Sequence, residues 1–205
     1  MKKHVKEILK RLDEHYPTEN ICYLNYTHDY ELLFATILSA QCTDNRVNIV
    51  TKDLFAKYTT LEAFAEADPQ EMEQDIRTTG FYKNKAKSII QSANMLLGKK
   101  MPHQIEELTK LSGVGRKTAN VVRSHIFNLP SIVVDTHVKR ISKKLGLTEN
   151  TDPVKIEFDL MDILPKDHWI RYNTQIIAHG RAICKAPVPK CNLCFLADLC
   201  PSRQN

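Results

Sequence analysis

Residues 111–120 read LSGVGRKTAN and join two stretches with the hydrophobic periodicity of amphipathic helices, at about 105–111 and 116–128. The two glycines allow a sharp turn and the close approach of another backbone. Their amide groups come at the start of the second helix, where the helix dipole favours an anion. Such a helical hairpin can hold a DNA phosphate without reading a base, although a plain turn between two helices would show the same pattern.

Lys117 and Asp135 are the two candidates for catalysis. Lys117 falls near the positive end of the second helix and beside Arg116, and both features disfavour an ammonium and favour a nucleophilic amine. A surface lysine that contacts phosphate is the alternative. Asp135 follows the apolar run 132–134 and begins the helix expected at 136–145, so an N-cap is its better interpretation when it is taken alone. Beside an amine, its carboxylate could instead stabilise a developing sugar cation or assist proton transfer.

Four of the six cysteines lie near the C-terminus with the spacing C-x6-C-x2-C-x5-C. They are Cys184, Cys191, Cys194 and Cys200. In a reducing cytoplasm, a close set of thiols is expected to bind metal rather than to form disulfides. Zinc ribbons generally carry two C-x2-C pairs, whereas this chain has one. A single loop wrapped around an iron–sulfur cubane therefore fits the spacing better than a zinc site does. Unligated thiols are the third alternative. Cys22 and Cys42 are expected to be ordinary half-buried thiols.

The rest of the sequence predicts helices almost throughout. Val5, Ile8, Leu9 and Leu12 recur at helical spacing and predict a helix that ends before Pro17. Further helices are expected over 32–40, over 47–55 with Ile49 among its apolar residues, and over 86–97, 153–163 and 168–183. The run 131–134 is the only strand-like stretch and is too short for a sheet, so the expected fold class is all-α.

Composition and charge limit the class of protein. The chain has 205 residues, of which 42% are hydrophobic and 26% charged, and these values exclude wholesale disorder. Its apolar runs are too short for a membrane span, and charges at 2–7 stand where a signal sequence would be apolar, so we expect a cytoplasmic location. Neither the phosphate loop nor the G-x-G-x-x-G fingerprint is present. The net charge is +5, with basic residues in excess over 99–145 and 165–205, which suits a polyanionic partner.

Together these features resemble the endonuclease III branch of the helix–hairpin–helix DNA glycosylases. The resemblance covers about residues 5–200 and is carried by LSGVGRKTAN at 111–120, VDTH at 134–137, the four-cysteine tail, LSAQCTD at 38–44 and TGFYKNKA at 79–86. It implies two helical lobes that flank a DNA cleft. Residues 22–132 would form a helical barrel lobe with the helix–hairpin–helix, and residues 1–21 and 133–205 would form an iron–sulfur cluster lobe.

The resemblance also implies a reaction. The chain would be a monomeric, bifunctional DNA glycosylase and AP lyase of base excision repair. Its partner would be double-stranded DNA that contains an oxidised pyrimidine or an abasic site, with the target nucleotide flipped out of the stack. The Lys117 amine would attack C1′ and form a Schiff base, Asp135 would assist loss of the base, and β-elimination would cut the strand.

Further positions receive DNA-binding or cofactor roles from the same resemblance. Gln41 would fill the space left by the flipped nucleotide, and Phe81 would wedge between the bases. Contacts to DNA are also expected from Gly113, Val114, Gly115 and Arg116 in the hairpin, and from Lys185 and Lys190 in the loop near the cysteines. The four cysteines would hold a 4Fe–4S cluster that shapes this loop and takes no part in base removal.

Several residues depart from the family pattern. Ser112 stands where a proline is usual, Phe81 stands where a leucine or isoleucine is usual, and 172–175 replaces an aromatic, His-rich stretch. These differences bear on substrate range, so a related glycosylase for thymine mismatches or pyrimidine photodimers is the first alternative. The second is a non-catalytic iron–sulfur or zinc-stabilised protein that binds nucleic acid. Such a protein would lack the lysine–aspartate pair, whereas this chain has Lys117 and Asp135.

Overall fold

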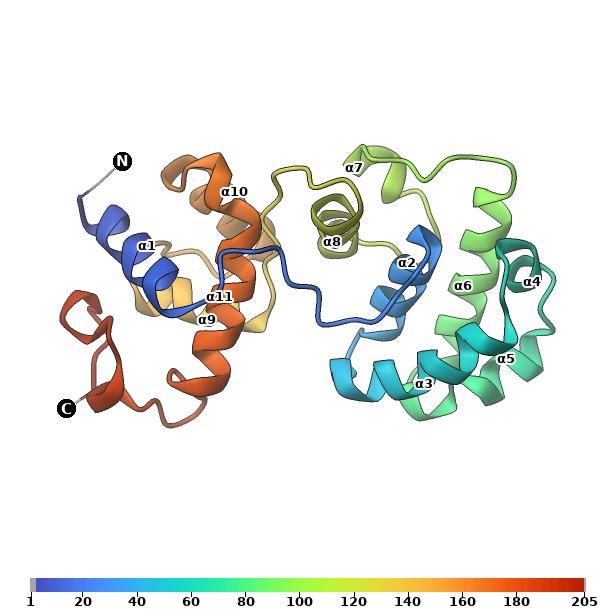
Figure 1. The fold of residues 1–205 in the computed structure, drawn as a ribbon, viewed down its shortest axis with the longest axis horizontal. Coiled ribbons are helices and arrows are strands. Elements are labelled where there is room, and N and C mark those ends of the chain that lie inside the picture. Colours follow the sequence, from blue (N-terminus) through green and yellow to red (C-terminus); the bar gives the residue numbers. More distant parts are fainter. Residues whose placement is uncertain (1–2, 205) are drawn as a thin grey trace. The chain divides into compact units, whose positions relative to one another are not determined.

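The computed structural model describes residues 3–204, and the regular secondary structure of this part of the chain is entirely helical (Figure 1). The all-α fold class is therefore confirmed. The α-helices are α1 (Lys3–His15), α2 (Asp29–Leu38), α3 (Asp44–Lys57), α4 (Leu61–Ala65), α5 (Pro69–Asp75), α6 (Tyr82–Leu96), α7 (Ile105–Leu108), α8 (Arg116–Ile126), α9 (Thr136–Lys144), α10 (Pro153–Ile163) and α11 (Trp169–Ala182). Short 3-10 helices are η1 (Arg77–Thr79), η2 (Lys166–His168), η3 (Cys191–Leu193) and η4 (Ala197–Leu199).

The chain forms two compact units. One is the continuous segment Cys22–Asn128, and the other combines Met1–Ile21 with Leu129–Asn205. The boundary expected from the sequence, after residue 132, lies slightly further along the chain. The structure places it just after α8, at Asn128, which has a left-handed backbone with φ of 49°. Asparagine adopts this conformation more easily than most residues, so it suits a sharp change of chain direction.

Helix α2 is the centre of the continuous unit. Its side chains are buried from Glu31 to Leu38, and it packs against α3, α6 and α8. A helix that is buried on all sides needs neighbours around its whole circumference, which the surrounding helices supply. Helices α2 and α8 therefore belong to the same hydrophobic core.

Helix α3 buries one face in the core and exposes the other. Thr43 is its N-cap, and the threonine side chain accepts a hydrogen bond from the amide of Arg46. The buried stripe of α3 consists of Val47, Val50, Thr51 and Leu54. Ile49, one of the apolar residues from which the helix was expected, lies off this stripe and is 52% exposed.

The second unit packs α1 and α9 against α11. Val5, Ile8, Leu9 and Leu12 of α1 are all buried, as their spacing predicts. The run 131–134 is also buried but forms no strand, and its backbone polar groups find other partners. Asn173 of α11, for example, donates a 2.9 Å hydrogen bond from its side chain to the Val133 carbonyl.

Arg11 attaches α1 to the C-terminal cysteine segment. Its guanidinium donates two hydrogen bonds to the Asp198 carboxylate, at 2.6 and 3.0 Å, and one to the Phe195 carbonyl at 2.8 Å. This forked geometry uses the planar donors of arginine fully. Within residues 3–204, no helix has both the length and the apolar character that a membrane crossing requires.

Candidate active site and cysteine centre

The hairpin between α7 and α8 depends on Gly113. This glycine has φ of +75°, and a Cβ placed there would lie 2.7 Å from both Cβ and Oγ of Ser88 on α6. Any other residue would therefore be strained and would also collide with α6. The next residue, Val114, points its side chain into the core and donates its amide to the Leu111 carbonyl at 3.2 Å.

Ser112 is held by two hydrogen bonds to α6. Its hydroxyl donates to Oε1 of Gln91 at 2.8 Å, and its carbonyl accepts from the hydroxyl of Ser92, also at 2.8 Å. Polar contacts to α6 thus fix the backbone at the position where the family pattern has a proline ring. In the sequence, Gln91 and Ser92 are ordinary residues in the middle of a helix, and nothing there indicates that they bind Ser112.

Gly115 leaves the start of α8 open. It is the N-cap, has no side chain to accept hydrogen bonds from the first amides, and a Cβ added to it would meet nothing within 4 Å. The first turn of α8 holds no acidic residue and instead carries Arg116 and Lys117. Lys117 is exposed at the second position of the helix. Backbone amides and two cations therefore meet at one end of a helix, which favours an anion.

Asp135 is the N-cap of α9. Its Oδ1 atom accepts a 2.7 Å hydrogen bond from the amide of Val138, so the structure shows the capping role that the sequence favoured for the residue taken alone. The side chain is half-buried. Asp135 belongs to the unit that contains the cysteines, and Lys117 belongs to the continuous unit.

Gln41 and Phe81 share an unusual backbone conformation. Their φ values are 53° and 51°, in the left-handed region that non-glycine residues rarely adopt. Both side chains are exposed, and Phe81 exposes 61% of its surface. The left-handed conformation of a non-glycine residue lowers the stability of the fold by on the order of 1–3 kcal/mol. Such residues are concentrated at functional sites.

Lys85 is a residue that sequence reasoning missed. It is only 5% exposed, and its ammonium group donates to the carbonyls of Leu38 and Thr79, each at 2.8 Å. Burial lowers the pKa of Lys85. The available signal was its helical spacing: it lies on the buried stripe of α6, one turn before Ile89.

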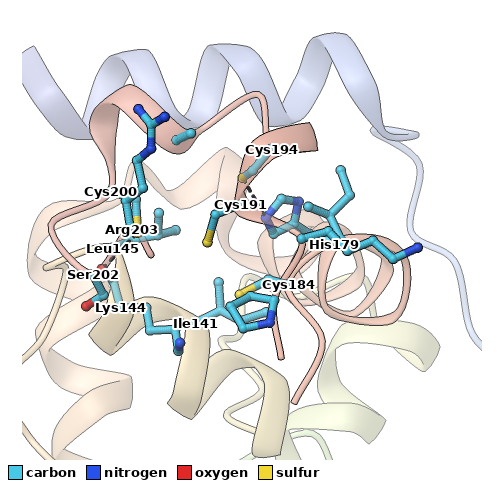
Figure 2. Close-up of a pocket in the computed structure, with 14 residues that line it drawn as sticks. Ile141, Lys144, Leu145, His179, Cys184, Cys191, Cys194, Cys200, Ser202 and Arg203 are labelled. Atoms are coloured by element: carbon cyan, nitrogen blue, oxygen red, sulfur yellow. Dashed lines mark hydrogen bonds between the residues drawn. The ribbon is translucent and has the colours of Figure 1, made fainter. Parts of the chain in front are cut away.

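The four C-terminal cysteines line one cavity (Figure 2). They come from the end of α11, from η3 and from the segments that follow it, and none forms a disulfide. Apolar side chains of Ile141, Leu145 and Ile183 complete much of the wall. Within the described residues, no three His, Cys, Asp or Glu side chains are arranged to hold a single metal ion.

Several groups contact the cysteines directly. Arg140 donates from Nη1 to the Cys184 carbonyl at 2.8 Å and lies 3.6 Å from its sulfur, and the Cys200 thiol lies 3.3 Å from the Lys144 carbonyl. Nε2 of His179 lies 3.6 Å from the Cys194 sulfur. Each contact comes from a helix of the same unit, so α9 and α11 orient the thiols.

The electrostatic environment of this cavity is cationic. Lys144, Lys190 and Arg203 line it together with the cysteines, and they can compensate the negative charge that thiolates would bring. Burial raises the pKa of the Cys194 thiol and of the Cys200 thiol.

The loop after Cys184 projects basic side chains. Its ends are joined at the Ile183 carbonyl, which accepts hydrogen bonds from the amides of Lys185 and Lys190, both at 2.9 Å. The two lysine side chains are exposed. The cysteine segment thus positions a small, positively charged loop.

The fold and these sites define the class of protein. The family model described as "HhH-GPD superfamily base excision DNA repair protein" matches residues 34–166, and the chain belongs to this family. It is 49% identical to Endonuclease III of Synechocystis sp., with 99% of this chain and 94% of that protein covered. It is 43% identical to Endonuclease III of Bacillus subtilis, with 98% and 94% covered.

A solved structure agrees with these relatives. A trapped covalent intermediate of Endonuclease III with DNA superposes with a TM-score of 0.91 at 43% identity, and the match covers 98% of this chain and 97% of the other. The resemblance to the endonuclease III branch is therefore confirmed.

Proposed function

We propose that this chain is a bifunctional DNA glycosylase and AP lyase of base excision repair, with Lys117 as its nucleophile. Relatives named Endonuclease III match nearly its whole length, and a DNA-bound one shares its fold. The observation that carries the assignment of Lys117 is its place in the structure. It is an exposed lysine in the first turn of α8, two residues after Gly115, an N-cap that has no side chain to bind the first backbone amides.

In the proposed reaction, the Lys117 amine first displaces the base and then, as a Schiff base, promotes cleavage of the strand. The neutral amine attacks C1′ of the flipped nucleotide, and the C1′–N bond to the base breaks as the base leaves with that electron pair and takes up a proton. Nζ loses a proton, the C1′–O4′ bond breaks as O4′ takes up a proton, and the Nζ lone pair forms an iminium (Schiff base) with C1′. Loss of a proton from C2′ expels the 3′ phosphate and cuts the strand. Asp135, which still has acceptor capacity beyond its cap hydrogen bond, would stabilise the cationic sugar.

The hairpin would hold the DNA backbone next to this lysine. A phosphate would bind the amides at Gly113 and Gly115 and the first turn of α8, and the Arg116 side chain would add charge. The Val114 amide already donates within the hairpin, so Val114 would contribute mainly by anchoring the turn in the core. Gln41 and Phe81 are exposed and fixed in unusual conformations, which suits insertion into the base stack.

The cysteine cavity fits a 4Fe–4S cluster. Four unpaired thiols line it, apolar side chains shield it, and cations stand beside it. Cys184, Cys191, Cys194 and Cys200 would be the ligands. When bound, such a cluster would supply a structural cross-link that orders the loop bearing Lys185 and Lys190 for contact with DNA. We also expect the protein to act as a monomer in the cytoplasm, where thiols stay reduced.

Borohydride trapping tests the proposed reaction. Reduction of the Schiff base should give a stable protein–DNA adduct with an abasic duplex for the wild type and none for Lys117→Ala. The matched control is Lys110→Ala, which removes an exposed lysine of the same hairpin that is paired with Glu107 at 2.6 Å. It should still form the adduct. An adduct with Lys117→Ala would show that another amine is the nucleophile.

Base choice needs a separate experiment. We propose oxidised pyrimidines as the substrate class, and thymine mismatches or pyrimidine photodimers as the alternative. Single-turnover excision rates on duplexes that carry each lesion would separate the two. A higher rate on the mismatch or the photodimer than on an oxidised pyrimidine would contradict the proposal.

A further inference from the structure

Lys85 occupies a position that is unfavourable for a cation. It is buried, and it stands near the N-terminal end of α6, where the helix dipole repels positive charge and the first turn holds no acidic residue. Within residues 3–204, its ammonium group donates to two backbone carbonyls and to no carboxylate. A residue that breaks local rules in this way is commonly retained for a functional reason.

The two carbonyls belong to separate segments. One is that of Leu38, the last residue of α2, and the other is that of Thr79, the last residue of η1. Carbonyls at helix ends lack intrahelical partners, so a buried ammonium can serve both. Lys85 therefore joins two chain segments that are far apart in the sequence.

Each segment leads directly to one of the exposed left-handed residues. The chain reaches Gln41 three residues after Leu38, and it reaches Phe81 two residues after Thr79. The backbone amide of Lys85 also donates to the Phe81 carbonyl at 3.1 Å. The same residue thus binds the carbonyls of Thr79 and Phe81 and the carbonyl of Leu38, in the segment that precedes Gln41.

We propose that Lys85 is a positioning residue, which holds Gln41 and Phe81 at a fixed separation for insertion into damaged DNA by binding the Leu38 and Thr79 carbonyls. This inference rests on the proposed function. The two side chains must enter one base stack together, and active geometries tolerate displacements of only about 0.5 Å. Without the shared ammonium, each segment would be free to shift on its own.

The test compares duplex with single-stranded DNA. Lys85→Met removes the hydrogen bonds, and Lys87→Met removes an exposed charge from the same helix as the matched control. For Lys85→Met, we expect borohydride trapping on an abasic duplex to slow by at least about tenfold. Trapping on a single-stranded abasic oligonucleotide, which has no stack to fill, should change by less than about twofold. Equal losses on both substrates, or no loss on the duplex, would overturn the proposal.

A double-mutant cycle gives a second readout. If Lys85 acts through Gln41 and Phe81, removing it from a variant that already carries Gln41→Ala and Phe81→Ala should cost little more duplex activity. Fully additive losses would overturn the proposal. Lys85→Arg keeps the donors and should restore part of the rate, and Lys85→Gln replaces the Met variant in the cycle if the latter does not fold. Absence of an adduct with the wild type would instead contradict the proposed function itself.

Discussion

The carboxylate of Asp135 accepts a 2.7 Å hydrogen bond from the backbone amide of Val138, three residues further along the chain. This contact gives Asp135 a structural duty at the start of α9, in addition to the chemical duty proposed for it. The two duties require different properties, since a cap needs an acceptor oxygen and the reaction needs a negative charge.

Asparagine separates these duties. For Asp135→Asn, we expect near wild-type thermal stability because the amide oxygen can still cap α9, and a loss of base excision of about 10²–10⁴-fold because the charge is gone. Asp135→Ala should also lose about 1 kcal/mol of stability. Thermal denaturation and single-turnover excision measure the two effects. Full excision activity in the asparagine variant would leave Asp135 with the capping role alone.

Gly113 and Gly115 should respond differently to a methyl group. Gly113→Ala requires φ of +75° and a contact of 2.7 Å with Ser88, so we expect it to lower the free energy of unfolding by about 1–3 kcal/mol. Gly115→Ala has open space and loses only the preference of the N-cap for glycine, so it should cost about 0.5–1 kcal/mol, while weakening DNA binding. Urea denaturation and affinity for an abasic duplex would be measured. Equal destabilisation of the two variants would contradict this account.

The cysteine cavity predicts a difference between two thiols. Cys194→Ser should lose iron, visible absorption and thermal stability together, because cluster binding and folding are coupled. Cys22→Ser changes a half-buried thiol in the other unit and should keep all three. Iron analysis and absorption spectra decide the point. A colourless wild-type protein that contains zinc would contradict the proposed 4Fe–4S cluster and support a structural zinc site instead.

His125 predicts a contribution to pH dependence. Burial lowers the pKa of this imidazole in α8 from its ordinary value of 6.5. The unfolded chain therefore binds a proton that the folded chain does not, once the pH falls through 6.5, and the stability that His125 contributes is lost in that direction. Between about pH 7.5 and 5.5, His125→Gln should lose less stability than the wild type. Identical slopes in urea denaturation would show that His125 does not carry this effect.

Features that follow from local pattern were predictable from the sequence. The burial of Val5, Ile8, Leu9 and Leu12 follows from helical spacing, because an amphipathic helix buries the stripe that carries its apolar residues. Ile49 shows the limit of this rule. It is apolar, yet the neighbours of α3 cover a stripe that excludes it.

Features that depend on contacts between distant segments were not predictable. The spacing of Lys85 places it on the buried stripe of α6, but the sequence does not show that the Leu38 and Thr79 carbonyls accept hydrogen bonds from its ammonium group. Ser112 likewise departs from the family pattern, and only the packing of α6 reveals that Gln91 and Ser92 hold it. Each case needs a tertiary partner whose position no short motif encodes.

The ion pair between Arg11 and Asp198 joins the first helix of a discontinuous unit to its last segment. During synthesis on the ribosome, residues Cys22–Asn128 are made before α9, α11 and the cysteine segment of the second unit. Domains generally fold as units in the order of their synthesis. The continuous unit can therefore fold first, and α1 must wait for α11 before it can pack and for the cysteine segment before Arg11 can bind Asp198. Binding of the proposed cluster by Cys184, Cys191, Cys194 and Cys200 would then follow the folding of the continuous unit.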